Sequence, residues 1–170
     1  GPLRSMLEPS PATARGAFLE LLDNVLHGSA SHAESQAGLS DARAAALMSL
    51  GPRQLVVKAL EVVDGGGIVQ HVSPMGRSFF EVPGSRSETY LVLPHFCSCV
   101  HFTNSVLRRP QQSPFLCKHV IAVRVALACV PVKTQVVQAE SEEEYSDKLQ
   151  VLSEARPKPV RKSLPGSAAP

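Results

Sequence analysis

The sequence has no tryptophan, and aromatic residues make up only 5% of its 170 positions. It contains no apolar run near the ~20 residues that a membrane-spanning helix needs, and it shows no signal-peptide pattern. Neither sign of charge dominates, because 17 basic residues face 15 acidic ones and leave a net charge of +2. We therefore expect neither a membrane protein nor a strongly basic, histone-like DNA coat.

Cysteine is also scarce, with four residues. In a chain without a signal peptide, so few thiols indicate a reducing, intracellular setting, where cysteines bind metal or pack in a core. The length fits one domain with tails better than two full domains. Residues 1–5, which precede Met6, are typical of a protease-cleavage and cloning scar.

Three helices are predicted in the first 63 residues. The N-terminal segment, residues 6–39, contains a short amphipathic helix at 17–26. Its apolar stripe consists of Phe18, Leu21, Leu22, Val25 and Leu26. Ser40 is a suitable N-cap for a second helix that ends at Leu50. Gly51 and Pro52 end that helix, and Pro52 suits the first position of a third helix that reaches Val63.

Short runs rich in β-branched and aromatic residues follow at 68–72, 78–82 and 89–93. Turn-forming residues separate them, which predicts a three-stranded antiparallel meander. A final helix is predicted from Lys118 to Val130. The fold class is therefore α+β, with one domain of helices, meander and C-terminal helix over residues 40–133. Residues 134–170 carry an acidic block and then a basic, proline-containing stretch, and we expect them to be a disordered tail, in which Lys148 to Ala155 could form a weak helix.

The strongest chemical signal is Cys97-x-Cys99, followed after residues 100–116 by Cys117-x-His119. Three thiolates and one imidazole in two close pairs match a closed tetrahedral Zn²⁺ site. Alternate side chains of a knuckle-like turn can converge on one ion, so each pair would supply one edge of the tetrahedron. The zinc would join the meander to the last helix and stabilise a core that is poor in aromatic residues.

Other interpretations of these residues stay open. The four could be ordinary buried side chains, or Cys97 and Cys99 could form a disulfide, which short-loop strain disfavours. His101 could replace His119 as a ligand, although three ligands would then crowd together. Cys129 lies on an apolar helix and is expected to be a packed core thiol. Four protein ligands leave no open position for an activated water, so we expect no enzymatic activity.

The spacing resembles that of a SWIM-type zinc finger, and Ala122 provides the small residue that this pattern favours after the histidine. Further blocks between residues 42 and 130 are similar to the SWIM-domain subunit of the Shu complex. These blocks are Ser73-Pro74-x-Gly76-Arg77, Val82-x-Gly84-Ser85-x-Ser87-x-Thr89-Tyr90, Ser105-Val106-Leu107-Arg108 and Leu116-Cys117-Lys118-His119-x-x-Ala122-Val123. The resemblance implies zinc ligation by Cys97, Cys99, Cys117 and His119.

In that family the protein forms a heterodimer with a RecA-like recombinase paralogue. The complex supports recombinase filaments on single-stranded DNA during homologous recombination. The resemblance therefore implies a nuclear, non-catalytic subunit in DNA repair with Zn²⁺ as its cofactor. Two other functions stay open: a SWIM-type DNA-binding module that acts alone, and a substrate-recruiting interaction module.

The last predicted helix is apolar on nearly all sides, so it must be buried on more than one side. We expect a partner subunit to cover one of these sides, together with part of the N-terminal stripe. The alternative is burial within the domain itself. The predicted partner contacts are Val120, Val123, Leu127, Phe18 and Leu22.

Basic residues concentrate in residues 40–133, where ten basic and five acidic side chains leave a net charge of +5. Weak contacts with DNA phosphates are predicted for Arg77, Arg86, Arg108, Arg109 and Lys118. Five aromatic residues could stack on bases but are expected to form the core instead. They are Phe79, Phe80, Tyr90, Phe96 and Phe102.

Overall fold

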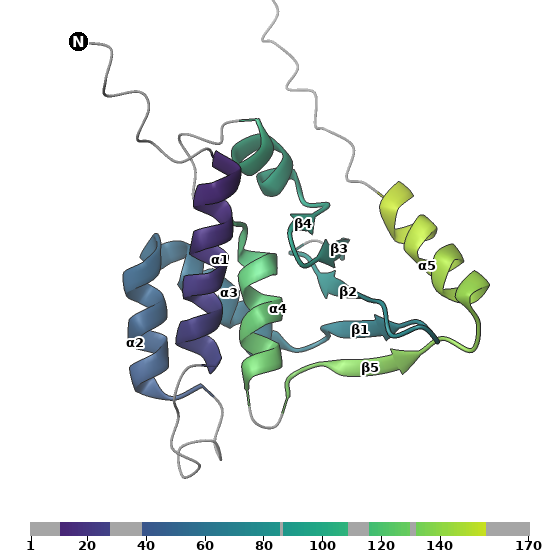
Figure 1. Cartoon of the computed structure of the whole chain (residues 1–170), viewed down its shortest axis with the longest axis horizontal. Coiled ribbons are helices and arrows are strands. Elements are labelled where there is room, and N and C mark those ends of the chain that lie inside the picture. The colour runs from purple at the N-terminus through teal and green to yellow at the C-terminus, as the bar shows by residue number, and fades with distance from the viewer. Residues whose placement is uncertain (1–10, 28–38, 86, 109–115, 130–131, 156–170) are drawn as a thin grey trace, which may run out of the picture.

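Four helices pack together at one end of the molecule, and a sheet extends from them toward a fifth helix on the far side (Figure 1). This computed structural model describes residues 11–27, 39–85, 87–108, 116–129 and 132–155. The expected cloning scar, the linker at 28–38 and the end of the tail lie outside these residues. Within them, no helix is long and apolar enough to cross a membrane.

The chain begins with α1 (Pro11–His27), α2 (Asp41–Leu50) and α3 (Arg53–Gly65). Ser40 caps α2 as predicted, because its Oγ accepts a hydrogen bond of 3.4 Å from the backbone N–H of Arg43. Pro52 occupies the N-cap position of α3 instead of its first turn.

The buried face of α1 differs from the predicted stripe. Leu19, Leu22 and Leu26 are buried, whereas Leu21 is 48% exposed. Phe18 and Val25 are half-buried and pack against the core. The apolar face is displaced because α1 contacts both α2 and the last helix of the core, α4 (Lys118–Ala128).

The sheet has five strands in the order β4-β3-β2-β1-β5. They are β1 (Val69–Val72), β2 (Ser78–Pro83), β3 (Thr89–Leu93), β4 (Phe96–Cys97) and β5 (Gln135–Gln138). Strands β1, β2 and β3 form the predicted antiparallel meander. β4 continues it in antiparallel fashion, while β5 pairs with β1 in parallel. A short π-helix, η2 (Phe102–Leu107), follows β4 and leads toward α4.

Helix α4 lies at the centre of the main core, in contact with α1, α3 and strands β2, β3 and β4. Of its apolar residues, all but Leu127 are buried. Its one mid-helix charge, Arg124, forms an ion pair with Asp23 of α1 and donates a hydrogen bond of 3.1 Å to the carbonyl oxygen of Pro94. The domain therefore buries most of this helix and pairs its charge within the chain, while a hollow of about 200 Å³ remains along Val120, Val123 and Leu127.

This burial corrects our expectation that a partner covers α4. Val120, Val123 and Leu22 are at most 5% exposed, so each offers little surface to a partner, although Val120 and Val123 line one hollow and Leu22 lines another. Leu127 and Phe18 are half-buried and pack against the same core. The alternative, burial within the domain, holds because α1, α3 and the sheet together surround the helix.

The expectation of a disordered tail is also wrong for residues 134–155. Strand β5 docks on β1 through hydrogen bonds of 2.9 Å from Gln135 N to Ile68 O and from Ala139 N to Val72 O. Helix α5 (Glu142–Glu154) follows, and the Oγ of its N-cap, Ser141, accepts a hydrogen bond from the Glu144 backbone N–H. The charged composition predicted disorder wrongly, because a few buried side chains are enough to hold a charged helix against the sheet.

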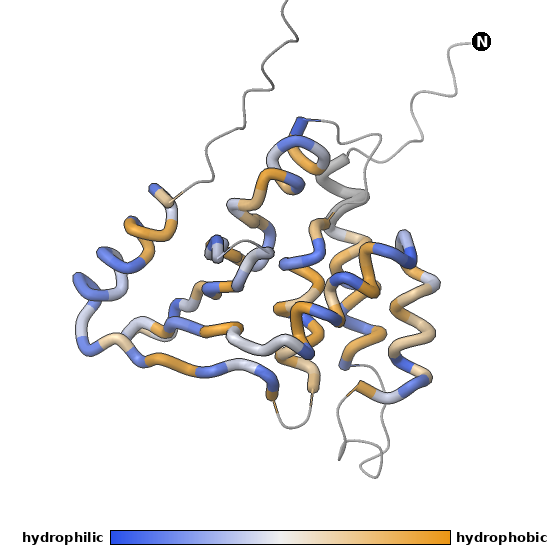
Figure 2. The backbone as a smooth tube through the Cα atoms, turned by 180° about the vertical axis from the view of Figure 1, so that it is seen from behind, coloured by the Kyte–Doolittle hydropathy of each residue, from blue (hydrophilic) through white to orange (hydrophobic). Residues whose placement is uncertain are grey.

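Helix α5 covers the face of the sheet opposite to α4. Successive strand residues point to opposite faces, so Phe80 and Val92 join the main core while Phe79 and Leu91 form a second, smaller one. Four side chains buried to 5% exposure or less make this second core: Phe79, Leu91, Tyr145 and Leu152. Hydrophobic and hydrophilic residues alternate along α5, which is consistent with packing on one side only (Figure 2).

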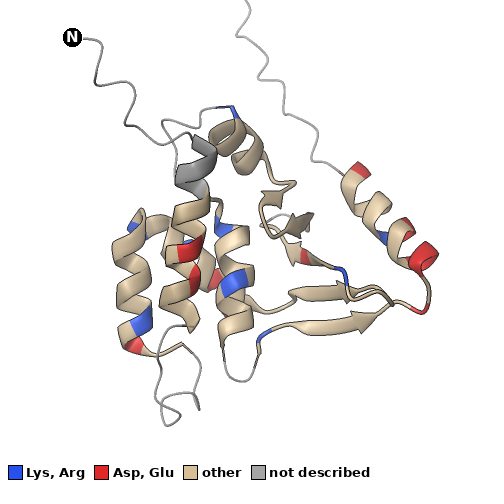
Figure 3. Cartoon of the chain, in the orientation of Figure 1, with Lys and Arg blue, Asp and Glu red and all other residues tan. Residues whose placement is uncertain are grey.

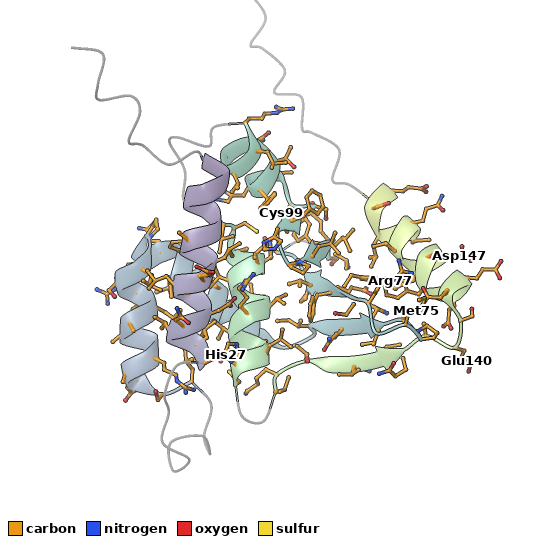
Figure 4. The ribbon with its side chains drawn as sticks, in the orientation of Figure 1. His27, Met75, Arg77, Cys99, Glu140 and Asp147 are labelled. Carbon is orange, nitrogen blue, oxygen red and sulfur yellow. The ribbon has the colours of Figure 1, made fainter. Side chains whose placement is uncertain are left out.

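Ion pairs hold α5 at the edge of the second core. Arg77 pairs with Glu142, and its guanidinium lies 5.4 Å from the centre of the Tyr145 ring. Figure 4 shows Arg77 and Met75 beside the start of α5, whose first turn is acidic (Figure 3). Glu81 of β2 binds both Lys148 and His71, each at 3.0 Å. The pKa of Glu81 is raised by burial, but its hydrogen bonds with Lys148 and His71 outweigh this and lower the pKa overall.

We predict that Tyr145→Ala detaches α5 without disturbing the main core. Removing a buried aromatic ring costs about 3 kcal/mol, and Tyr145 is the largest side chain that α5 contributes to the second core. Hydrogen exchange should become faster in α5 and β5 and stay unchanged in α4. Val151→Ala on the same helix is the control, because Val151 is 61% exposed. Unchanged exchange in α5 of the Tyr145 variant would contradict this assignment.

We also predict that α5 loosens in acid. Because the pKa of Glu81 is lower in the folded protein than its ordinary value of 4.5, the pair with Lys148 stabilises the fold fully above pH 4.5. This contribution is lost as the pH falls from 4.5 through the lowered pKa. Hydrogen exchange of α5 should therefore accelerate over this range in the natural protein. In Glu81→Gln it should already be faster at neutral pH and change less with acid; an identical pH profile for both proteins would refute the prediction.

Candidate metal centre

The two predicted ligand pairs meet in the interior, between the sheet and the start of α4. Cys97 ends β4, Cys99 lies two residues later, Cys117 is the N-cap of α4, and His119 is in its first turn. Their ligand atoms all lie within 4.8 Å of one another, and each residue is at most 4% exposed. Figure 4 shows Cys99 where β4, η2 and α4 meet.

The arrangement fits Zn²⁺ in both chemistry and spacing. Three sulfurs and one imidazole nitrogen are a typical donor set of a structural zinc site. A tetrahedral ion with Zn–S bonds of ~2.3 Å separates neighbouring ligand atoms by roughly 3.5–3.8 Å. The Nδ1 atom of His119 lies 3.8 Å from the Sγ atom of Cys97. Bound zinc would therefore join the end of the meander to the first turn of α4.

Ser98, between the first two cysteines, explains why their side chains converge. It is buried, and its Oγ accepts a hydrogen bond of 3.0 Å from the Leu91 backbone N–H. Its own N–H donates to the Leu91 carbonyl oxygen at 2.9 Å. These bonds fasten the turn to β3 with Cys97 and Cys99 on the same side of it. The sequence offered no sign of this role, because any residue fits the x of Cys-x-Cys.

Backbone N–H groups surround the sulfur atoms. The Cys99 N–H donates to the Sγ of Cys97 at 3.5 Å, and the Phe102 N–H donates to the Sγ of Cys99 at 3.3 Å. A third backbone bond, from Val120 in the first turn of α4, favours the thiolate form of Cys117. Such bonds stabilise the negative charge that thiolates bring into a buried site.

The three thiols compete for negative charge. Hydrogen bonds from Cys117 and Cys97 lower the pKa of Cys99 far below its ordinary value, while hydrogen bonding with Cys117 and Cys99 raises the pKa of Cys97. Burial raises the pKa of Cys117 to about 12. Three thiolates so close together repel one another, and a divalent cation between them would offset this repulsion.

The two histidines that flank the first ligand pair, His95 and His101, lie outside the cluster. Both are exposed. All four cysteines are free thiols, so Cys97 and Cys99 form no disulfide. Cys129 is 3% exposed in the main core, as predicted for a packed thiol, and burial raises its pKa.

The predicted DNA-contacting residues separate into three groups. Arg77 is engaged with Glu142 and Tyr145, so it serves the docking of α5 instead of presenting a free cation. Arg86 and Arg109 lie outside the described residues. Arg108 is exposed at the end of η2, and Lys118 is half-buried at the start of α4, next to the metal centre.

The aromatic residues are core residues, as expected. Phe79, Phe80, Tyr90 and Phe102 are at most 7% exposed. Phe96 is partly buried and packs edge-on against Phe102, with 5.6 Å between the ring centres. None of the five therefore offers a free face for stacking on a base.

Tyr90 contributes to the centre in a way that the sequence did not reveal. Its ring lies 4.6 Å from that of His119 and forms a wall beside the ligand. The close approach of Gly84 on its other side requires a glycine, because a Cβ atom there would come within 2.6 Å of the Tyr90 ring. Gly84 and Tyr90 thus hold the histidine ring from the side of the β2–β3 turn.

A small sheet and a helix that bury three cysteines and one histidine in CxC and CxH pairs define a zinc-finger type of metal centre. Relatives of the chain have a matching description. It is 46% identical over 68 residues to zinc finger SWIM domain-containing protein 7 of Homo sapiens. It is 41% identical over 69 residues to the protein of that name in Mus musculus, and 35% over 74 residues in Danio rerio.

These matches cover 39%, 39% and 42% of this chain and 47%, 44% and 51% of the three relatives, respectively. The chain thus spans about half the length of the curated relatives it matches. No family model matches the chain. The relatives confirm the resemblance to SWIM zinc-finger proteins, and their names describe a zinc finger and no catalytic activity.

We predict that Cys99→Ser and His119→Ala each abolish zinc binding and unfold the domain. Structural zinc sites supply on the order of 10 kcal/mol of folding free energy, and this one links β4 to α4. Metal analysis should find a single zinc ion per natural chain and none in either variant, with loss of helical circular dichroism. Cys129→Ala is the matched control, since it removes a buried thiol outside the cluster and should keep the zinc. Retention of zinc by Cys99→Ser would show that this residue is not a ligand.

Proposed function

We propose that this chain is a non-catalytic, zinc-binding subunit of a recombination-mediator complex. In this function it pairs with a RecA-like recombinase paralogue in the nucleus. The pair supports recombinase filaments on single-stranded DNA during homologous recombination repair. The observation that carries the proposal is the buried cluster of three cysteines and one histidine, in a chain whose relatives are SWIM zinc-finger proteins.

The chemistry of the centre supports a structural function. Four protein ligands complete a tetrahedral zinc ion, so no coordination position is left for a substrate or a reactive water. The ligands are buried beneath Tyr90 and the start of α4. A centre of this kind fixes the relative positions of the sheet and α4 and thereby shapes the surface around them.

Exposed apolar residues outside the core support a partner surface. Most apolar residues of α1 and α4 pack within the domain, so we propose that the partner contacts exposed residues of other elements. Edge strand β5 is exposed along its whole length and includes Val136, which is 53% exposed. Leu107 on η2 and Val100 beside the metal centre are also exposed, at 48% and 43%. These residues offer apolar contact area outside the core.

The proposal predicts that a RecA-fold ATPase co-purifies with the chain and that this depends on zinc. Tagged natural protein and Cys129→Ala should enrich the same ATPase, as measured by quantitative mass spectrometry. Cys99→Ser should lose it, because the surface around the metal centre collapses. Recovery of the natural protein without any RecA-like ATPase would refute the heterodimer. If Cys99→Ser recovers as much of the ATPase as the natural protein does, partner binding does not depend on the metal.

A further inference from the structure

Two adjoining hollows lie beside the metal centre. The first, about 270 Å³, is lined by Lys58, Ser85 and Lys118 together with the outer side of the zinc cluster. The second, about 340 Å³, is lined by the same three residues and by the glycines at the end of α3 and in the β2–β3 turn. Since they share these three residues, the two hollows form one groove, which we call the lysine groove.

The lysine groove gathers cations that have no acidic partner. Lys58 comes from α3 and Lys118 from α4, and among the described residues neither forms an ion pair. Arg77, Arg124 and Lys148, by contrast, each pair with a carboxylate. The first hollow has no acidic lining residue, and Glu61 is the single carboxylate that lines the second. Lys58 and Lys118 with Glu61 leave a formal charge of +1, and a zinc ion with three thiolates, of net charge −1, lies in the wall of the first hollow, so the groove depends on its two unpaired lysines for attraction to an anion.

A buried donor without an acceptor lies in the wall of the first hollow. His119 lines this hollow, and its Nε2 atom is buried and has no hydrogen-bond partner among the residues that the structure describes. With Nδ1 facing the cluster and available to zinc, Nε2 carries the hydrogen and is a donor. Zinc-bound histidines normally donate this second N–H to an oxygen acceptor. A water molecule or an oxygen atom of a molecule bound in the groove can supply this acceptor.

The chemistry of the groove favours a phosphate group. Lysine is a compact cation that binds phosphate as a point charge, and the two lysines of the lining, which have no acidic partner among the described residues, can each contact a phosphate oxygen. The aromatic wall, Tyr90, is buried and has no free face for a base. A ligand here would thus be held through its backbone and not read through its bases.

We propose that the lysine groove binds the phosphate backbone of single-stranded nucleic acid, with Lys58 and Lys118 contacting phosphates and the Ser85 hydroxyl donating a hydrogen bond. This inference rests on the proposed function in that it gives this subunit its own contact with the strand. The groove adjoins the metal centre because zinc fixes the start of α4, and with it the distance between the two lysines.

The test measures binding of a fluorescent oligothymidylate to the full, zinc-loaded chain by anisotropy at several salt concentrations. For single strands, each phosphate contact adds about 0.7 to the slope of log affinity against log salt. The double variant Lys58→Ala/Lys118→Ala should bind at least about tenfold more weakly, with a slope smaller by about 1.4. Lys133→Ala removes an exposed lysine outside the groove and should bind like the natural chain.

The single variant Lys58→Ala tests whether the loss of affinity is an indirect effect of lost zinc. Lys118 lies between two zinc ligands and its replacement could disturb them, whereas Lys58 lies on another helix, α3. With natural zinc content, Lys58→Ala should still lose affinity and lower the slope by about 0.7. The proposal is overturned if the natural chain does not bind the oligonucleotide, or if Lys133→Ala loses as much affinity as Lys58→Ala. It is also overturned if the groove variants keep DNA affinity but lose a protein partner, which would assign the lysines to an acidic protein surface.

The two proposals fail separately. If the groove variants lose DNA affinity as expected while no RecA-like ATPase co-purifies, the lysine groove stands and the recombination heterodimer does not. If the ATPase co-purifies with natural chain and groove variants alike and all bind DNA equally, the heterodimer stands and the groove does not.

Discussion

The convergence of Cys97, Cys99, Cys117 and His119 is the constraint on which the rest of the structure depends. These residues come from two distant stretches of the chain, and their ligand atoms nevertheless lie within 4.8 Å of one another in the interior. Three buried thiolates repel one another and are stable only with a cation between them. The metal therefore determines where α4 begins relative to β4, and α4 in turn contacts α1, α3 and three strands.

The two faces of the sheet are stabilised in different ways. On one face, α4 is buried among helices and needs almost no polar contacts beyond the pair between Arg124 and Asp23. On the other face, α5 buries only Tyr145 and Leu152, so ion pairs with Arg77 and Glu81 supply part of its attachment. Exposed pairs of this kind contribute little individually. The attachment of α5 is thus more sensitive to pH and to single substitutions than the packing of α4.

Local signals in the sequence predicted the elements that depend on local chemistry. The two ligand pairs, the N-cap at Ser40 and the three-stranded meander each require particular residue types at short spacing, and the structure contains all of them. The C-terminal elements were missed because their stability comes from contacts such as Phe79 with Tyr145, whose ring centres lie 5.0 Å apart across 65 intervening residues. An acidic segment with few apolar residues resembles a disordered tail until its distant docking site is known.

The burial of α4 shows a second limit of interpreting a sequence alone. It also sets Lys118, the first residue of the helix, apart from the residues that follow it. An apolar helix must be buried, but its own sequence does not tell whether the covering surface belongs to the same chain. Here the same chain covers it, and even Arg124 is used to bind α1. Lys118 is then the single Lys or Arg of α4 that has no acidic partner among the described residues. It lies beside the metal centre and lines the lysine groove with Lys58, so the interior packing of α4 leaves this half-buried lysine available for recognition.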